Sequence, residues 1–150
     1  MAPDSPPTPR PQLQASPGRR PRPVRGTRVL VVDDSPANLR FAVYWLRRAG
    51  CAVQTCADGD QVVPTVEAAV AAGAPIDLCL MDLRMDRLDG DAALAALRQA
   101  GHAALPVVLA TAHATAADAE RYRGVGFAGL LSKPFSPEQL RVAVARALET

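Results

Sequence analysis

Four short apolar runs, each followed at once by a polar residue, limit the folds open to this chain more than any other feature. Residues 28–32 lead into Asp33 and Asp34, residues 78–81 into Asp82, residues 107–110 into Thr111, and residues 130–132 into Lys133. Longer segments of helical period separate the runs, and this alternation is typical of buried parallel strands joined by crossover helices. The sequence therefore predicts an α/β fold, doubly wound, with helices on both faces of the sheet.

The polar residues at the ends of these runs are expected to share one edge of the sheet. Crossovers between parallel strands are right-handed, so the strands end along the same edge, where open α/β sheets bind their ligands. Three carboxylates, a hydroxyl and an ammonium are therefore predicted to meet there.

Residues 1–26 differ in composition from the rest of the chain. They hold eight of the fourteen prolines and five of the sixteen arginines, with Asp4 as the one acid. Proline fixes the backbone, the arginines repel one another and little apolar surface is available, so we predict a disordered arm, partly polyproline II. A solubilising tail or linker is favoured over a basic tether for nucleic acid or a partner. Residues 27–150 are predicted to form one folded domain.

Charge and hydropathy exclude several classes of protein. Residues 27–150 carry 12 basic and 14 acidic groups, so the folded part is near −2 while the whole chain is +2. A body of that charge gives no electrostatic basis for binding duplex nucleic acid. No apolar stretch approaches the length of a membrane span, and the N-terminus lacks the apolar segment of a secretory signal. We therefore expect a cytoplasmic protein that binds neither a membrane nor nucleic acid.

The three cysteines, Cys51, Cys56 and Cys79, cannot all pair with one another, and their spacing matches no zinc site. We expect them to be small core residues with unreactive thiols.

The remaining elements follow from local signals. A short strand is expected at 52–56, and helices are expected at 36–48, about 61–72, about 91–99, 116–123 and from Pro137 onward. Ser35 and Pro36 supply the N-cap and the first residue of the first of these helices. The helix at 116–123 carries few large apolar residues, so we expect it to be the least firmly packed element.

The first helix is apolar over much of its surface. Its main stripe contains Phe41, Ala42, Trp45, Leu46 and Ala49. Three further apolar residues fall largely outside that stripe: Leu39, Val43 and Tyr44. Such a surplus either forms a partner-docking surface or packs under neighbouring loops, and the sequence leaves both interpretations open.

The clustered polar residues indicate phosphoryl-transfer chemistry. Asp33, Asp34 and Asp82 would repel one another at a buried strand edge unless a cation neutralised them. Oxygen ligands of this kind favour Mg²⁺, which keeps several waters and takes substrate phosphate as well. Thr111 offers a hydroxyl donor, and Lys133 is a compact cation suited to phosphate oxygens. Lys133 is also the one lysine in the chain, beside sixteen arginines, so an ammonium is the exception at this position.

These residues carry a family resemblance. The pairs Asp33-Asp34, Met81-Asp82 and Thr111-Ala112, together with Lys133-Pro134-Phe135, resemble the signature set of two-component response-regulator receiver domains. Met85 with Asp89-Gly90 resembles the loop that follows the phosphorylated aspartate of that family. The match extends over residues 27–150 and is specific because five sparse positions agree together.

The resemblance implies a five-stranded parallel sheet in the flavodoxin-like order 2-1-3-4-5. It implies that Asp82 is the phosphoacceptor and attacks the phosphoryl group of a phosphohistidine in line. Asp34, Asp82 and the main-chain carbonyl of Arg84 would hold Mg²⁺, and Asp33 would act mainly through water. Thr111 and Lys133 would bind the phosphoryl oxygens.

The resemblance also implies what this protein works with. The partner would be a sensor histidine kinase or a histidine phosphotransfer protein, with a downstream protein target possible in addition. Enzymatic activity would be limited to Mg²⁺-dependent self-phosphorylation from a donor and to autodephosphorylation. The run Asp33-Asp34-Ser35-Pro36-Ala37-Asn38 resembles receivers of hybrid kinases and phosphorelays, so a stand-alone receiver and part of a multi-domain kinase system are both open.

Four positions depart from the family pattern or tune it. Asp86 stands where proline usually follows the methionine, which adds an acid and loosens a normally stiff loop. Leu130 takes the place of the usual Tyr or Phe switch residue, so the aromatic flip that normally accompanies Thr111 is not expected in its usual form. Arg84 and His113 fall where the family adjusts phosphoryl lifetime.

Three other functions fit this sequence less well. A magnesium phosphatase of the haloacid dehalogenase type needs an Asp-x-Asp pair, and Asp82-Leu83-Arg84 lacks the second acid. A flavin module on the same fold needs a first loop rich in small polar residues, whereas here that loop begins with two acids. A pseudo-receiver that only binds proteins is the main alternative, and the intact signature set argues against it.

Overall fold

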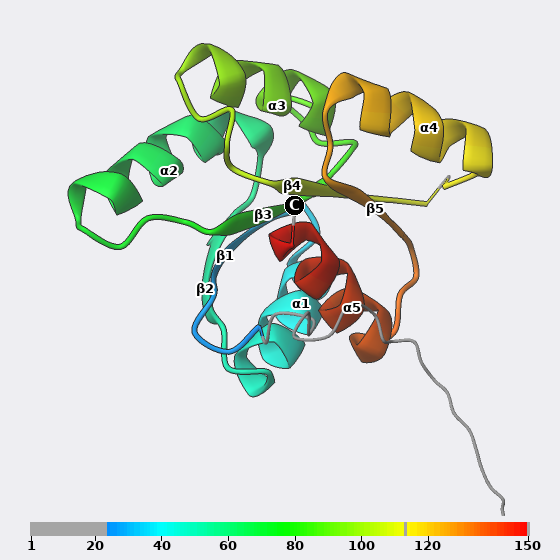
Figure 1. Ribbon diagram of the computed structural model, residues 1–150, viewed down its shortest axis with the longest axis horizontal. Coiled ribbons are helices and arrows are strands. Elements are labelled where there is room, and N and C mark those ends of the chain that lie inside the picture. The colour runs from blue at the N-terminus through cyan, green and yellow to red at the C-terminus, as the bar shows by residue number, and fades with distance from the viewer. Residues whose placement is uncertain (1–23, 113, 150) are drawn as a thin grey trace, which may run out of the picture.

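A computed structural model describes residues 24–112 and 114–149 and shows a parallel sheet between two layers of helices (Figure 1). The strands are β1 (Arg28–Val32), β2 (Ala52–Cys56), β3 (Leu78–Asp82), β4 (Val107–Thr111) and β5 (Gly129–Ser132). They form one five-stranded sheet in the order β2-β1-β3-β4-β5, and every neighbouring pair is parallel. The predicted α/β, doubly wound fold and its flavodoxin-like strand order are confirmed.

Helices cover both faces of this sheet. They are α1 (Pro36–Arg48), α2 (Val62–Ala71), α3 (Gly90–Gln99), α4 (Ala116–Val125) and α5 (Pro137–Leu148), with a 3₁₀ turn, η1 (Gly59–Gln61), before α2. Figure 1 shows α2, α3 and α4 on one face, and α1 with α5 on the other. None of the described helices is long and apolar enough to cross a bilayer.

The apolar runs of β1, β3 and β4 are continuous because these three strands are buried on both faces. Successive side chains of a strand point to opposite sides of the sheet. Leu30 and Val32 of β1 pack in the core cluster beneath α2 and α3, while Val29 and Val31 pack in the cluster beneath α1 and α5. A strand with a helix layer on each side therefore needs apolar residues at every position.

The helix α1 starts and ends as its sequence predicts. The Ser35 side chain accepts a hydrogen bond from the Asn38 amide at 3.3 Å, and the chain leaves the helix through Gly50, whose φ is +96°. Within the stripe, Ala42 and Leu46 are buried, whereas Phe41, Trp45 and Ala49 are half-buried. Of the residues outside it, Leu39 and Val43 are half-buried and Tyr44 is 54% exposed.

Small differences from the predicted elements lie at element ends. The helix expected from about residue 61 begins at Val62, after the 3₁₀ turn, and α4 extends two residues beyond 123. All three cysteines are free and buried, as expected, and burial raises the pKa of the Cys51, Cys56 and Cys79 thiols. Residues 1–23 of the predicted arm lie outside the described residues, whereas Val24 is buried against the α1 and α5 layer.

Candidate functional site

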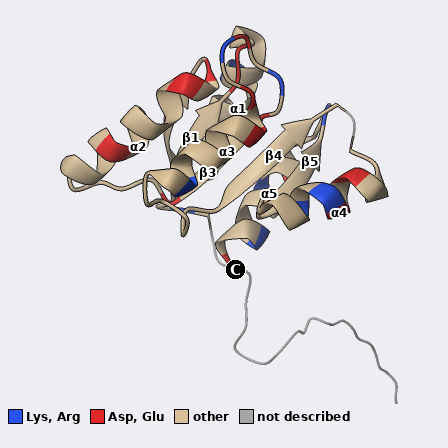
Figure 2. Cartoon of the chain, turned by 90° about the horizontal axis from the view of Figure 1, so that it is seen from above, with Lys and Arg blue, Asp and Glu red and all other residues tan. Residues whose placement is uncertain are grey.

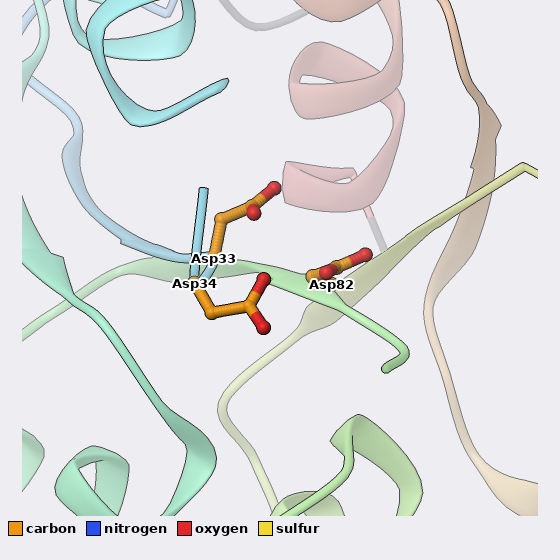
Figure 3. A group of neighbouring side chains, drawn as sticks. All are labelled: Asp33, Asp34 and Asp82. Carbon is orange, nitrogen blue, oxygen red and sulfur yellow. The ribbon is translucent and has the colours of Figure 1, made fainter. Parts of the chain in front are cut away.

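Strand register brings the three predicted carboxylates together. Val32 of β1 pairs with Met81 of β3, so Asp33 and Asp82 are the next residues on adjacent strands. One carboxylate oxygen each from Asp33, Asp34 and Asp82 lies within 4.8 Å of the other two. Figure 3 shows the three side chains together at the ends of β1 and β3. Asp33 is buried, Asp82 is half-buried and Asp34 is exposed, so the group opens to solvent on the side of Asp34.

The ammonium of Lys133 joins this group from the end of β5. Its Nζ donates to Asp33 Oδ2 at 3.1 Å and to Asp82 Oδ1 at 2.8 Å. Only 21% of the Lys133 side chain is exposed, and the Asp82 and Asp33 side chains are exposed by 12% and 8%. The ion pairs are therefore largely removed from solvent, where charges interact more strongly than at an open surface.

Burial and charge shift the pKa of both partners. Burial raises the pKa of the Asp82 carboxyl, and the charge of Asp33 raises it further, against the lowering effect of the hydrogen bond from Lys133. Burial lowers the pKa of Lys133, but its hydrogen bonds to Asp82 and Asp33 and their charges outweigh burial and raise it. The surroundings of Asp82 therefore disfavour its ionised form, and an additional positive charge there would stabilise it.

The pairing of β4 with β5 places Thr111 next to Asp82 and Lys133. Thr111 ends β4, is buried, and pairs with Ser132 of β5. The Lys133 amide donates to the Thr111 carbonyl at 2.9 Å, which ties the main chain of the lysine to that of the threonine. The four buried or half-buried residues predicted at this edge, Asp33, Asp82, Thr111 and Lys133, therefore come together with Asp34.

A hollow of about 390 Å³ lies above Asp82. Its lining includes the predicted residues Asp82, Arg84, Thr111 and Lys133, and also three residues of α4: Asp118, Arg121 and Tyr122. The Arg121 guanidinium lies 4.5 Å from the centre of the Tyr122 ring, and its Nη2 donates to the Tyr122 hydroxyl at 2.8 Å. Figure 2 shows acidic and basic residues along this helix.

Sequence reasoning missed the residues of α4. Nothing in the order of residues 116–125 says which side of the helix faces Asp82, because that depends on how α4 packs. The one usable signal is that Tyr122 is the largest apolar side chain of a helix with few others, and such a residue is expected to face inward. It is the one buried side chain of α4.

The two departures from the family pattern lie in different surroundings. Leu130 is half-buried and packs against the core cluster beneath α2 and α3. Asp86 is exposed and forms no hydrogen bond or ion pair with another described residue. His113 lies outside the described residues.

The residues present fit a magnesium ion. Their donors are the carboxylate oxygens of Asp33, Asp34 and Asp82, which are hard ligands that lie close together at the ends of two adjacent strands. The raised pKa of Asp82 shows that the lysine alone does not compensate its burial.

Comparison with known proteins decides the family. The family model described as the response regulator receiver domain matches residues 29–145. The chain belongs to this family. The receiver is 36% identical over 119 residues to the histidine-protein kinase BarA of Escherichia coli, covering 79% of this chain and 12% of BarA. It is 37% identical over 123 residues to the alginate regulatory protein AlgB of Pseudomonas aeruginosa, covering 81% of this chain and 26% of AlgB. The receiver thus spans a small part of these relatives.

Solved structures agree with this assignment. The chemotaxis protein CheY4 of Vibrio cholerae superimposes with a TM-score of 0.69 at 29% identity, covering 81% of this chain and 98% of CheY4. A CheY-like receiver domain protein of Methanospirillum hungatei gives a TM-score of 0.70 at 20% identity, covering 83% of this chain and 94% of that one, and shows the shared fold. The family match favours a receiver over the phosphatase and flavin alternatives.

Proposed function

We propose that this receiver accepts a phosphoryl group from a phosphohistidine of a partner protein onto the Asp82 carboxylate. The observation that carries the proposal is the pair of hydrogen bonds from Lys133 Nζ, at 2.8 Å to Asp82 and 3.1 Å to Asp33. A compact cation held against a half-buried carboxylate at the ligand-binding edge of a parallel sheet suits the transfer of a charged phosphoryl group.

In the proposed reaction an oxygen of Asp82 forms a bond to phosphorus while the bond from phosphorus to the histidine nitrogen breaks. The displaced electron pair stays on the imidazole, which leaves as the neutral ring once a proton is bound. Lys133 and Thr111 bind the phosphoryl oxygens by charge and by a hydroxyl hydrogen bond. The contribution of these residues is positioning and charge neutralisation, as expected for a loose phosphoryl-transfer transition state.

Magnesium would be held by Asp34, Asp82 and the main-chain carbonyl of Arg84, with Asp33 acting mainly through water. When bound, it supplies positive charge that offsets the three carboxylates and the incoming phosphoryl oxygens. The closeness of the three carboxylates supports this assignment, because they repel one another without a cation.

The receiver would act on no external substrate. Its chemistry would be limited to taking phosphate from a donor and to losing it by hydrolysis of the acyl phosphate. The name of BarA, a histidine-protein kinase, supports a partner that carries phosphohistidine. That partner would be a sensor histidine kinase or a histidine phosphotransfer protein, with a downstream protein target as a further possibility.

The setting of the receiver is also part of the proposal. Residues 27–150 would be the receiver and residues 1–26 a Pro/Arg-rich arm, in a cytoplasmic protein that binds neither nucleic acid nor membrane. Both a stand-alone receiver and a receiver within a longer kinase remain compatible with the short spans shared with BarA and AlgB.

The mass of the intact protein tests this function. After incubation with a small-molecule phosphodonor and Mg²⁺, we expect the wild-type protein to gain one phosphoryl group. The gain should be lost without Mg²⁺ and in Asp82→Asn. No adduct in the wild type, with a donor that labels a control receiver, would favour the pseudo-receiver that only binds proteins.

A further inference from the structure

The helix α3 begins at an aspartate that does not cap it. Asp89 is the N-cap residue of α3, yet its side chain makes no cap hydrogen bond. At the N-caps of α4 and α5, by contrast, Thr115 and Ser136 each accept a hydrogen bond at 3.1 Å from the third residue of the helix. Aspartate is among the residues preferred for that role, so its carboxylate at this position serves another contact.

That contact is the amide of Met85. The Met85 N–H donates to Asp89 Oδ1 at 3.0 Å. The Met85 nitrogen belongs to the same peptide group as the Arg84 carbonyl, and this peptide group is trans. A trans peptide is planar, with its C=O and N–H pointing in opposite directions. By holding the Met85 N–H, Asp89 therefore fixes the direction of the Arg84 carbonyl, which points away from Asp89.

The rest of the loop keeps Asp89 itself in place. The Asp58 carboxylate, which is buried, accepts hydrogen bonds from the Arg87 and Leu88 amides, each at 2.9 Å. The Gly90 amide donates to the Leu83 carbonyl at 2.7 Å and closes the loop at its base. Both ends of the loop are therefore held by directed bonds.

Glycines allow this close packing. A Cβ on Gly59 would collide with the Leu88 carbonyl, and a Cβ on Gly90 would collide with the Asp82 carbonyl. The two loops after β2 and β3 therefore approach backbone to backbone. Hydrogen bonds from main-chain amides to the carboxylates of Asp58 and Asp89 thus order a loop in which Asp86 replaces the usual proline.

We propose that Asp89 is a positioning residue that directs the main-chain carbonyl of Arg84 into the magnesium site. The proposal rests on the proposed function, because the Arg84 carbonyl is a ligand only if the site takes Mg²⁺. Partners that orient metal ligands typically change metal affinity by about 10- to 100-fold when they are removed. Asp89 would act in this way through one peptide plane.

The test is the dissociation constant for Mg²⁺, measured by calorimetry on the full chain. Asp89→Ala should weaken binding by about tenfold or more, because the peptide plane loses its acceptor. Asp89→Asn should keep most of the affinity, because its amide oxygen still accepts the Met85 N–H. Asp86→Ala, which removes a loop carboxylate that has no such bond, controls for the loss of one negative charge. Thr115→Ala controls for the loss of an N-cap elsewhere.

A second variant and a second measurement guard against simple destabilisation. Asp89→Ser keeps a favoured N-cap residue but moves the acceptor nearer the main chain, so it should weaken Mg²⁺ binding as Asp89→Ala does. Without metal, hydrogen exchange at the Met85 amide should be slow in the wild type and in Asp89→Asn and faster in Asp89→Ala and Asp89→Ser.

The outcomes separate the two proposals. Equal Mg²⁺ affinity in Asp89→Ala, Asp89→Asn and Asp86→Ala, or unchanged exchange at Met85, overturns the positioning role, while phosphoryl uptake by the wild type leaves the proposed function intact. A wild-type protein that binds no Mg²⁺ overturns both.

Discussion

The helices α4 and α5 begin alike but are held differently. Both have a capping box, formed by Thr115 with Asp118 in α4 and by Ser136 with Gln139 in α5. Four residues of α5 are buried: Leu140, Val144, Ala145 and Ala147. Only Tyr122 is buried among the described residues of α4. Local signals therefore fix where a helix starts, whereas burial decides how firmly it is held.

This difference matters because the two helices flank the candidate site. The connection before α5 carries Lys133, which is bonded to Asp33 and Asp82. The α4 side contributes Arg121 and Tyr122 to the same hollow. Phosphorylation at Asp82 would thus take place between α5, which is firmly packed, and α4, which is packed less firmly. We expect α4 to be the helix that responds.

The largest expected effect is in the core beneath α5. Leu140→Ala should lower the free energy of unfolding by about 2–5 kcal/mol, because Leu140 is only 1% exposed and its removal leaves a cavity. Val125→Ala on α4 should change it by less than about 0.5 kcal/mol, because Val125 is 41% exposed. Urea unfolding followed by circular dichroism measures both. Similar losses for the two variants would contradict the comparison.

The two helix caps should give smaller effects. Thr115→Ala and Ser136→Ala each remove a cap hydrogen bond worth about 1 kcal/mol. In α5 we expect that loss to appear in global stability, because α5 is held by the core. In α4 we expect faster hydrogen exchange confined to that helix. If Thr115→Ala speeds exchange across the whole domain, α4 is not the lightly held element.

The smallest expected effect concerns the charge of Asp82. Its folded pKa is raised above the ordinary value of 3.8 by burial and by the charge of Asp33, against the hydrogen bond from Lys133. The stability from this group is therefore present below pH 3.8 and lost as pH rises through the folded pKa. At pH 7 without metal, Asp82→Asn should raise the free energy of unfolding slightly, because the amide carries no charge to be desolvated or repelled by Asp33.

Bound Mg²⁺ should reverse the relative stability of the wild type and Asp82→Asn. With Mg²⁺ at a hundred times its dissociation constant, the wild type should gain about 2.7 kcal/mol and Asp82→Asn much less. Glu67→Gln on α2, which removes one exposed carboxylate that does not line the hollow, serves as the matched control and should leave the metal effect unchanged. Thermal unfolding at pH 5 and pH 7, with and without Mg²⁺, measures these shifts. A lower melting temperature of metal-free Asp82→Asn at pH 7 would show that the pair with Lys133 outweighs burial.

The sequence predicted the parts of the fold that rest on hydrophobic pattern. Strands buried on both faces read as apolar runs, and the polar residues that end them meet because parallel strands end along one edge. The order of the strands came from the family resemblance. Contacts that depend on side-chain direction could not be predicted from the sequence. Asp58 and Asp89 each look like turn residues, and the hydrogen bonds that they accept from the Leu88 and Met85 amides form only in the folded loop.

Burial on α1 was harder to predict for a related reason. Periodicity groups Phe41 and Trp45 with Ala42 and Leu46, but the larger rings extend past the edge of the core and stay half-buried. Phe41 instead contacts Phe135 of the β5–α5 connection edge to face, with ring centres 5.7 Å apart. Such a contact between distant segments has no signature in a single helix.

Chemical trapping of the phosphorylated residue tests the assignment of Asp82 most directly. Borohydride reduces an aspartyl phosphate to homoserine, so the labelled position can be read by mass spectrometry of peptides after treatment with phosphodonor and Mg²⁺. We expect homoserine at position 82, with Asp33 and Asp34 unchanged. Homoserine at either of those two positions, or phosphate that resists borohydride on another residue, would contradict the assignment.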